Sequence, residues 1–241
     1  MTQSVKIVVS KTLAVNNLSI IIPVLNEEKY IGNLLQILVN QSLKNFEVIV
    51  VDGKSTDNTI KVVEKFKNKL NLKIIKAPHK GVSFQRNLGA SNASAEILLF
   101  LDADVSFENN FLEKIVKEFN TKDYGVGTVA SFPDDHNFLD TFLSTIYNFY
   151  QRLTANFNPV VYGFIILSTK IAHKSINGFN ENLIFAEDTD YVKRIVEKGF
   201  KFQIIDSIKI YYSTRRIKRE GRLVYEYKMI KYFFTKKIKY D

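Results

Sequence analysis

The residues most able to do chemistry are acidic side chains that follow short apolar runs. Asp102 and Asp104 come after ILLFL, Asp52 comes after EVIVV, and Asn26 and Glu27 follow LSIIIPVL. Carboxylates crowded together repel one another unless a cation or hydrogen-bond donors lie between them. Mg²⁺ and Mn²⁺ prefer such hard oxygen ligands, and Mg²⁺ typically combines one or two carboxylates with substrate phosphates. Asp102-Ala-Asp104 therefore predicts a divalent-metal site, unless the pair only caps the helix that follows.

These residues lie where strands should end in a repeating strand–helix pattern. Apolar runs predict strands at 18–22, 46–51, 72–75 and 96–101, and amphipathic stretches predict helices at 27–40, 57–69, 82–94 and 108–119. This alternation predicts a mostly parallel sheet with right-handed crossovers and helices on both faces. Ligands bind beyond the carboxyl ends of such strands, so the acidic residues should share one edge.

The rhythm changes in the second half of the chain. We expect strands at 125–132, 160–168 and 202–205 and helices at 137–153 and 187–198. The 241 residues suit one α/β domain with an appendage. We divide them into an extension (1–17), a domain (18–212, with halves 18–120 and 121–212) and a C-terminal tail (213–241).

Composition narrows the class of protein. The chain has no cysteine, which excludes a disulfide framework and a thiolate zinc site. No apolar run approaches about 18 residues, and no signal peptide is evident, so we expect a cytoplasmic protein. His79, His136 and His173 lack ligand spacing, and we expect them on the surface or in loops.

The formal charge of +9 is concentrated at the C-terminus, where residues 214–241 carry ten Lys or Arg against three acidic residues. Aromatic residues alternate with lysines there, a composition suited to an anionic membrane surface. An aromatic helix containing Phe138, Phe142, Ile146 and Phe149 could join that surface. The alternative is that all these aromatic side chains pack on the domain while the lysines face solvent.

Five segments together resemble family 2 glycosyltransferases of the GT-A fold. They occur in the order IPVLNEE, VVDGKSTDNT, GVSFQRNLGA, LLFLDADV and NGFNENLIFAEDTDYVKRIVEKG, and the match spans roughly 18–205. The resemblance implies inverting transfer of a sugar from a nucleotide-diphosphate sugar, with UDP favoured over GDP and with Mg²⁺ or Mn²⁺ as cofactor. It implies a glycan or polyprenyl-phosphate-type acceptor, and such an enzyme would work in the cytoplasm, peripherally at the inner face of the membrane.

The resemblance also implies roles for individual residues. Asp104, with Asp102, would hold the metal, Asp188 would be the general base, and Glu187 would orient the acceptor or Asp188. Asn87 and Gly89 would shape a turn beside the nucleotide. The nucleotide sugar would contact Pro23, Asn26, Glu27, Asp52, Arg86 and Asp102, and Arg215 or Arg216 would hydrogen-bond the diphosphate.

The chain departs from the family pattern in two places. Many members have two consecutive Asp where this chain has Asp52-Gly53, followed by Lys54, which puts a second nucleotide contact in doubt. The Gln-x-x-Arg-Trp signature of processive members is absent, and the chain has no Trp, so the resemblance implies transfer of a single sugar.

Other classes of function are open at this stage. The chain could bind a nucleotide without catalysis, although Asp104 and Asp188 are intact. It could bind nucleic acid through the basic tail with a strong salt dependence, but no nucleic-acid motif is present and we do not expect this partner. A nucleotidyltransferase would need a Gly-rich N-terminal loop, which is missing.

Overall fold

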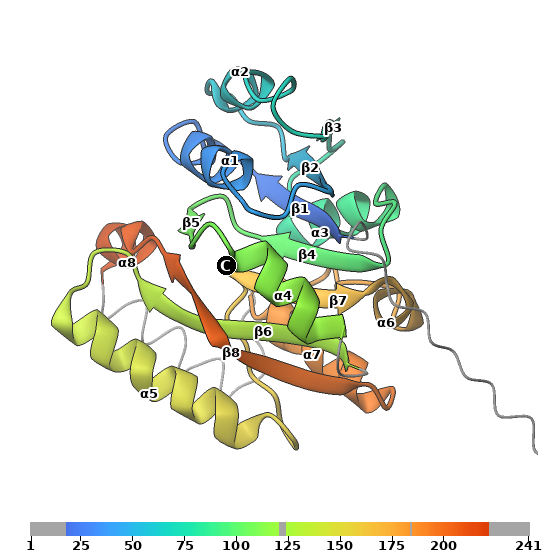
Figure 1. Ribbon diagram of the computed structural model, residues 1–241, viewed down its shortest axis with the longest axis vertical. Coiled ribbons are helices and arrows are strands. Elements are labelled where there is room, and N and C mark those ends of the chain that lie inside the picture. Colours follow the sequence, from blue (N-terminus) through green and yellow to red (C-terminus); the bar gives the residue numbers. More distant parts are fainter. Residues whose placement is uncertain (1–17, 121–123, 184, 222–241) are drawn as a thin grey trace, which may run out of the picture.

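A computed structural model describes residues 18–120, 124–183 and 185–221. The predicted extension 1–17 and the tail from 222 onward lie outside the described residues. In the first half, strands and helices alternate (Figure 1): β1 (Leu18–Val24), α1 (Ile31–Val39), β2 (Phe46–Asp52), α2 (Thr59–Glu64), β3 (Leu72–Lys76), α3 (Val82–Ser91), β4 (Ile97–Leu101), β5 (Val105–Ser106) and α4 (Phe111–Asn120).

The second half contains three strands and several helices. They are β6 (Tyr124–Pro133), α5 (Phe138–Thr154), β7 (Ile165–Thr169), α6 (Lys170–Ser175), α7 (Glu187–Glu197), β8 (Lys201–Tyr212) and α8 (Arg215–Glu220). Within the described ranges, no helix is both long and apolar enough to cross a bilayer.

One eight-stranded sheet joins the two halves in the order β3-β2-β1-β4-β7-β6-β8-β5. Strands β1 to β4 of the first half are parallel, as predicted, whereas β5 pairs antiparallel with β8. The second half is mixed, because β7 runs antiparallel to β4 and β6 while β8 runs parallel to β6. A continuous apolar run looks the same in either direction, so the sequence could not reveal the direction of β7.

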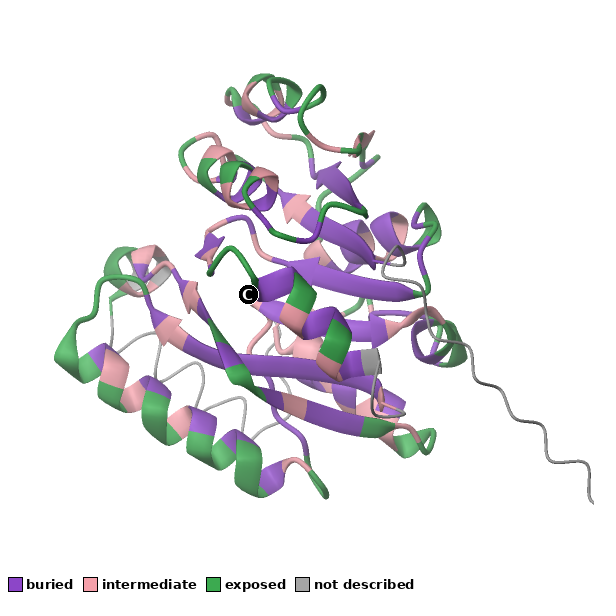
Figure 2. Ribbon diagram, in the orientation of Figure 1, coloured by how far each residue is buried: buried purple, intermediate pink, exposed green. Residues whose placement is uncertain are grey.

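The apolar core lies on both faces of the sheet. Ile20 and Ile22 of β1 face one cluster, which includes residues of α1 and α4. Ile21 of the same strand faces a second cluster, which includes residues of α3, α6 and α7. This period of two sorts side chains between the layers, and the central strands are buried along their length (Figure 2).

Several element boundaries differ from the predictions. The helix expected from 27 begins at Ile31, because residues 27–30 form a turn that bonds to the loop before α2. The strand expected at 160–168 begins only at Ile165, and β8 extends far beyond 202–205. Both β5 and α6 were absent from the predictions.

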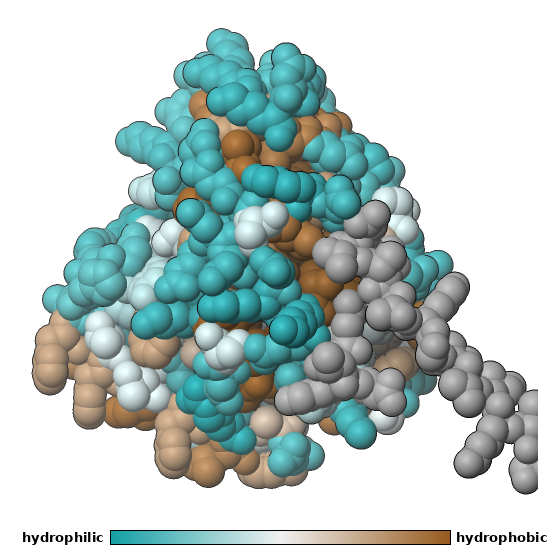
Figure 3. All heavy atoms as spheres, viewed as in Figure 1, coloured by the Kyte–Doolittle hydropathy of each residue, from teal (hydrophilic) through white to brown (hydrophobic). Residues whose placement is uncertain are grey.

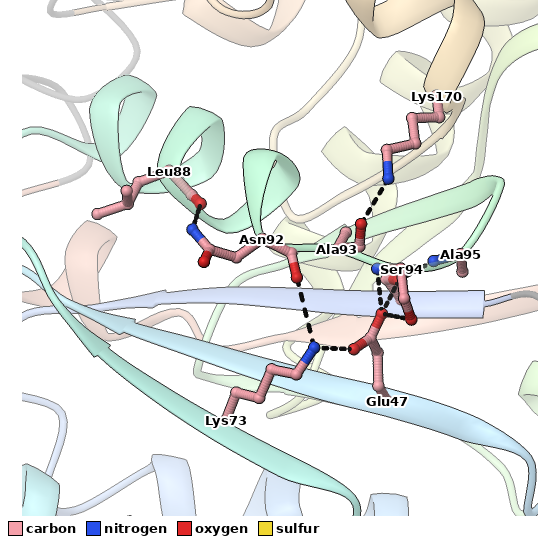
Figure 4. Close-up of polar contacts among 9 residues, drawn as sticks. Glu47, Lys73, Leu88, Asn92, Ala93, Ser94, Ala95 and Lys170 are labelled. Carbon is pink, nitrogen blue, oxygen red and sulfur yellow. Dashed lines mark hydrogen bonds and ion pairs between the residues drawn. The ribbon is translucent and has the colours of Figure 1, made fainter.

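A buried carboxylate ties four segments together at the amino-terminal edge of the parallel strands (Figure 4). Glu47 of β2 accepts from Ser19 Oγ of β1, from the backbone N–H and Oγ of Ser94 before β4, and from Lys73 Nζ of β3 at 2.8 Å. Burial alone would raise the pKa of Glu47, but Lys73, Ser19 and Ser94 outweigh it and lower the pKa to about 2. This cluster is charged, saturated with donors and remote from the acidic residues at the opposite strand ends.

Candidate functional site

A pocket of about 660 Å³ opens at the carboxyl ends of β1 and β4. Its wall includes six predicted site residues, together with Gln85 of α3 and the C-terminal segment around Tyr212. The six are Pro23, Asn26, Glu27, Asp102, Asp104 and Arg215, the last of which lines the pocket from α8. The edge rule for parallel sheets therefore located the cavity correctly.

The loops after β1 and β2 interlock beside this pocket. Asn26 donates its N–H to Ser55 Oγ at 2.9 Å and accepts the N–H of Thr56 at 2.8 Å on Oδ1. Asp52 is buried and accepts the N–H of Ser55 at 3.0 Å. Asn26 and Lys54 both have positive φ, 57° and 68°, a conformation that costs energy for non-glycine residues. Asp52 thus supports the loop from behind, and its predicted contact with the base stays a prediction.

Gln85 fixes the distance between the ends of β1 and β2. No role for this residue was predicted from the sequence. Its Nε2 donates to Val24 O at 2.9 Å and Val51 O at 2.7 Å. A Cβ at Gly53 would lie 2.8 Å from Gln85 Oε1, so a second Asp at position 53 would collide with this side chain. The departure from the Asp-Asp pattern at Asp52-Gly53 therefore accommodates the Gln85 bridge.

Arg86 is a buried hub rather than part of the pocket wall. Its side chain is 2% exposed, and its two terminal nitrogens donate to Glu187 Oε1 at 2.9 Å and to Asp102 Oδ1 at 3.1 Å. It also donates to Gly163 O at 3.1 Å and lies over the ring of Phe179. The predicted contact of Arg86 with the nucleotide stays a prediction, and its contacts make it a positioning residue between the end of β4 and α7.

Asp188 lies beside this hub, at the first turn of α7. Gly163 permits the close approach, because a Cβ there would lie 2.8 Å from Asp188 Oδ2 and 3.3 Å from Arg86 Nη2. Ala186, just before α7, has a left-handed φ of 55°. Desolvation and the charge of Glu187 raise the pKa of Asp188. A carboxylate whose pKa is raised towards neutrality is suited to accept a proton.

Asp102 has a similar electrostatic environment. Burial raises its pKa to about 6, with the negative charges of Asp104 and Glu187 adding to the effect and the guanidinium of Arg86 opposing it. The pKa of Asp104 is also raised, mainly by burial, although Arg215 opposes the shift. At the strand ends burial thus outweighs the arginine partners of Asp102 and Asp104, whereas at Glu47 the donors outweigh burial.

Arg215 supplies a strong cation in the pocket wall that contacts Asp104. Its Nε lies 2.8 Å from Asp104 Oδ2, its Nη atoms lie 2.7 Å from the Glu27 carboxylate, and its guanidinium stacks 4.1 Å from the ring of Tyr30. These ion pairs raise the pKa of Arg215 further, so it stays charged. Arg216 also lies in α8, but its side chain is outside the described part of the chain.

Asp102 and Asp104 fit a divalent cation in ligand type and number. Among the described residues, no three His, Cys, Asp or Glu side chains converge as a complete metal cage. Mg²⁺ needs no such cage when substrate phosphates supply further oxygens. Both carboxylates line the pocket, where a bound diphosphate could reach them. These two residues could therefore hold Mg²⁺ or Mn²⁺ jointly with a bound diphosphate.

Two predictions about other residues need correction. Asn87 and Gly89 lie inside α3 rather than in a turn: Asn87 bonds the backbone of Phe179, and Gly89 lets α3 pack against Ile21. His173 is buried on α6, where its Nδ1 lies 3.0 Å from the hydroxyl of Tyr191, rather than on the surface. Burial lowers the pKa of His173 to about 4, so it is a neutral core residue.

Comparison with known proteins shows which family this fold and sequence resemble. Residues 19–178 match the sequence profile of Glycosyl transferase family 2, which is more than half of the chain. The chain belongs to glycosyltransferase family 2. The fold agrees, since family 2 enzyme TarS of S. aureus (residues 1–349, crystallised with UDP) superposes with a TM-score of 0.68 and 25% identity over 82% of this chain and 60% of that one.

Other relatives of this family 2 chain differ in length and named activity. A dolichyl N-acetyl-alpha-D-glucosaminyl phosphate 3-beta-D-2,3-diacetamido-2,3-dideoxy-beta-D-glucuronosyltransferase of Methanococcus voltae is 29% identical over 83% of this chain and 68% of its own. The minor teichoic acid biosynthesis protein GgaA of Bacillus subtilis is 28% identical over 82% of this chain but only 47% of its own. A mannosyltransferase of Pyrobaculum calidifontis, crystallised with GDP-Man and Mn²⁺, shares the GT-A-type fold with a TM-score of 0.70 at 19% identity.

Proposed function

We propose that this chain transfers one sugar from a nucleotide-diphosphate sugar, with UDP as the favoured base and GDP second, to a glycan or polyprenyl-phosphate-type acceptor. The observation that carries the proposal is the pocket in which Asp102, Asp104 and Arg215 meet at the strand ends. The superposition on TarS, which was crystallised with UDP, supports a nucleotide there. We assign the donor to the half 18–120 and the acceptor to the half 121–212.

Asp188 is the proposed general base for inverting transfer. Its raised pKa allows it to take the proton of an acceptor hydroxyl as that oxygen attacks the anomeric carbon. Glu187 cannot easily swing into the same role, because Arg86 Nη1 holds its Oε1 at 2.9 Å. An acceptor phosphate would already be ionised and would depend less on Asp188. Glu187 and Arg86 therefore position the loop and α7 around Asp188.

Asp104, with Asp102, is the proposed holder of Mg²⁺ or Mn²⁺. A divalent ion on the diphosphate neutralises the charge that develops on the leaving group. Arg215 contributes a second positive charge from α8, and its planar fork suits two phosphate oxygens. Its present contacts with Glu27 and Asp104 place that fork in the pocket wall.

Membrane association through the basic segment 222–241 is a further part of the proposal. That segment lies outside the described residues. Two points support its role: its basic, aromatic composition and the proposed lipid-linked acceptor. An enzyme with such an acceptor would work at the inner face of the membrane.

A thermal-shift panel tests the donor proposal. UDP, GDP, CMP and dTDP are each added with Mn²⁺, Mg²⁺ or EDTA to the wild type and to Asp104→Asn. A ligand at ~100 times its Kd stabilises the fold by roughly 2.7 kcal/mol, which is about 5–10 °C for a chain of this size. We expect UDP to act only with metal and only on the wild type. Absence of any nucleotide effect would reject the donor pocket, and binding without turnover of a UDP-sugar would favour a binding protein.

A further inference from the structure

Helix α5 turns its polar side towards the protein and its apolar side outward, the reverse of an ordinary surface helix. Its buried residues are all polar: Asp140, Ser144, Asn148, Gln151 and Thr154. Its large apolar side chains are exposed instead, with exposed fractions from 39% to 85% for Phe138, Leu139, Phe142, Ile146, Phe149, Tyr150 and Leu153. Phe157, just beyond the helix, is 76% exposed. We call these eight side chains the outer face of α5.

Hydrogen bonds fix this orientation. Asn148 exchanges two bonds with the backbone of Ser131 on β6, at 3.0 and 3.2 Å. The hydroxyl of Ser144 lies 2.8 Å from that of Tyr212 on β8, and Gln151 donates to Val160 O at 3.0 Å. Rolling the helix to bury its apolar side would leave these buried polar groups unpaired, at a cost of about 1–3 kcal/mol each. The outer face therefore belongs to the folded state.

The outer face is a concentrated patch and not a scatter of apolar residues. Across the described residues, only Leu25 and Ile171 are exposed large hydrophobics outside it. Hydrophobic side chains gather along α5 at the lower left of the molecule (Figure 3). Single exposed apolar residues need no explanation, but a contiguous patch indicates a surface that is covered in use.

The charge of the adjoining chain indicates what covers this face. α8 is bonded beside the start of α5, because Thr214 Oγ1 and Lys218 Nζ each lie 2.7 Å from Asp135. The chain continues from there into residues 222–241, which carry six Lys or Arg, two acidic residues and six aromatic residues. An exposed apolar, aromatic helix in a chain that continues into a basic, aromatic sequence matches the composition of a site for anionic lipid.

We propose that the outer face of α5 docks on an anionic lipid bilayer, lying in the interface with its phenylalanines inserted. A symmetric dimer through the same face is less suitable, since a two-fold interface brings two copies of the basic segment together. This docking surface deepens the proposed function by supplying the lipid partner, and it does not require that UDP be the donor.

Docking would place the catalytic pocket close to the lipid. Tyr212 lines the pocket and bonds to Ser144 of α5. Stacked aromatic rings also join α5 to the pocket wall. The ring centroids of Tyr147 on α5 and Tyr162 are 3.6 Å apart, and those of Phe164 and Tyr212 are 4.2 Å apart. A lipid-linked acceptor could therefore reach the pocket while its chain stays in the membrane.

Vesicle co-sedimentation of the full chain, in buffer without nucleotide, tests the proposal. The probes are phosphatidylcholine vesicles with and without phosphatidylglycerol, and the variants are Phe142→Glu/Phe149→Glu and the matched control Ile171→Glu on α6. We expect the wild type and the control to bind vesicles containing phosphatidylglycerol more strongly than neutral ones. The double variant should bind at least about ten-fold more weakly, because two inserted rings are lost, with an unchanged melting temperature.

Several results would overturn this assignment. Equal vesicle binding by the wild type and the double variant would exclude the outer face, as would a wild type that binds neither vesicle. A wild-type dimer that the double variant converts to a monomer, without vesicle binding, would assign the face to a second copy. A much lower melting temperature for the double variant alone would show that residues 222–241 cover the face. Failure of the nucleotide panel would leave these results intact, so the two proposals fail separately.

Discussion

The two edges of the parallel sheet treat buried carboxylates in opposite ways. At the amino-terminal edge, Glu47 has more donors than it needs, and its pKa falls to about 2. At the carboxyl edge, Asp102 shares Arg86 with Glu187, and its pKa rises to about 6. A buried carboxylate is thus held by several donors at one edge, whereas at the other edge burial outweighs its single arginine partner.

The backbone shows the same division. Among the described residues, five non-glycine positions have positive φ, and three of them, Asn26, Lys54 and Ala186, flank the pocket or begin α7. None lies in the segments that surround Glu47. Positive φ angles and raised carboxylate pKa values at one edge, with a carboxylate held by several donors at the opposite edge, are the pattern expected where a ligand completes the structure.

The sharpest test of this contrast is Asp188→Asn. We expect turnover to fall by roughly 10²–10⁴-fold, because the amide cannot accept the acceptor proton. The free energy of unfolding should not fall, since a carboxylate with a raised pKa costs stability when it ionises. This relief should grow as pH rises from the unfolded-state pKa of 3.8 towards the raised folded-state value. Donor hydrolysis assays and melting curves across pH check both parts. A variant that is active, or that melts lower than the wild type at every pH, would contradict the role.

The second test removes the cation shared by the acids. Arg86→Met should destabilise the fold by about 3–5 kcal/mol, because Asp102 and Glu187 would lose a buried partner. The control is Arg152→Met, whose side chain is 42% exposed in a surface ion pair with Asp206, so we expect a much smaller effect. Urea unfolding measures both. Equal effects for the two variants would show that Arg86 has no special place in the structure.

The sequence predicts much of the difference between the two edges of the sheet, but not all of it. The acids at the carboxyl edge follow apolar runs directly, so the rule that parallel strands share an edge brings them together without side-chain detail. The sequence also singles out Arg86, but its sequence context could not show that its guanidinium is buried between Asp102 and Glu187. That outcome depends on Gly163 and α7, which are distant in sequence.

The outer face of α5 shows a related limit. The spacing of Phe138, Phe142, Ile146 and Phe149 predicts an amphipathic helix, which α5 confirms. Periodicity alone, however, implies that the apolar side faces the core. The polar side faces inward here because Ser144 and Asn148 hydrogen-bond to residues of β8 and β6. The local sequence around α5 does not predict these distant partners.

The third test acts on the amino-terminal edge. Glu47→Gln should destabilise the fold by on the order of 2 kcal/mol at neutral pH, since the amide loses the ion pair with Lys73 and some of the accepted bonds. The folded-state pKa is lowered, so this stability is fully present above the unfolded value of 4.5 and is lost as pH falls towards about 2. Denaturation at pH 7 and near pH 3.5 should show the difference shrinking. Glu64→Gln, in an exposed pair, should change little at either pH.

The smallest expected effect concerns Arg215. Its side chain is 32% exposed, so it is less buried than Arg86 but is still held by two carboxylates. Arg215→Lys keeps the charge near Asp104 and loses the planar fork. We therefore expect UDP affinity in the presence of Mn²⁺ to fall roughly ten-fold, about 1.4 kcal/mol, with little change in melting temperature without ligand. Arg215→Ala should weaken UDP further, because the positive charge is lost as well. Isothermal titration of both variants measures the difference. If both bind UDP as the wild type does, Arg215 only neutralises Glu27 and Asp104, and the carboxyl edge would be less open to a ligand than its raised pKa values indicate.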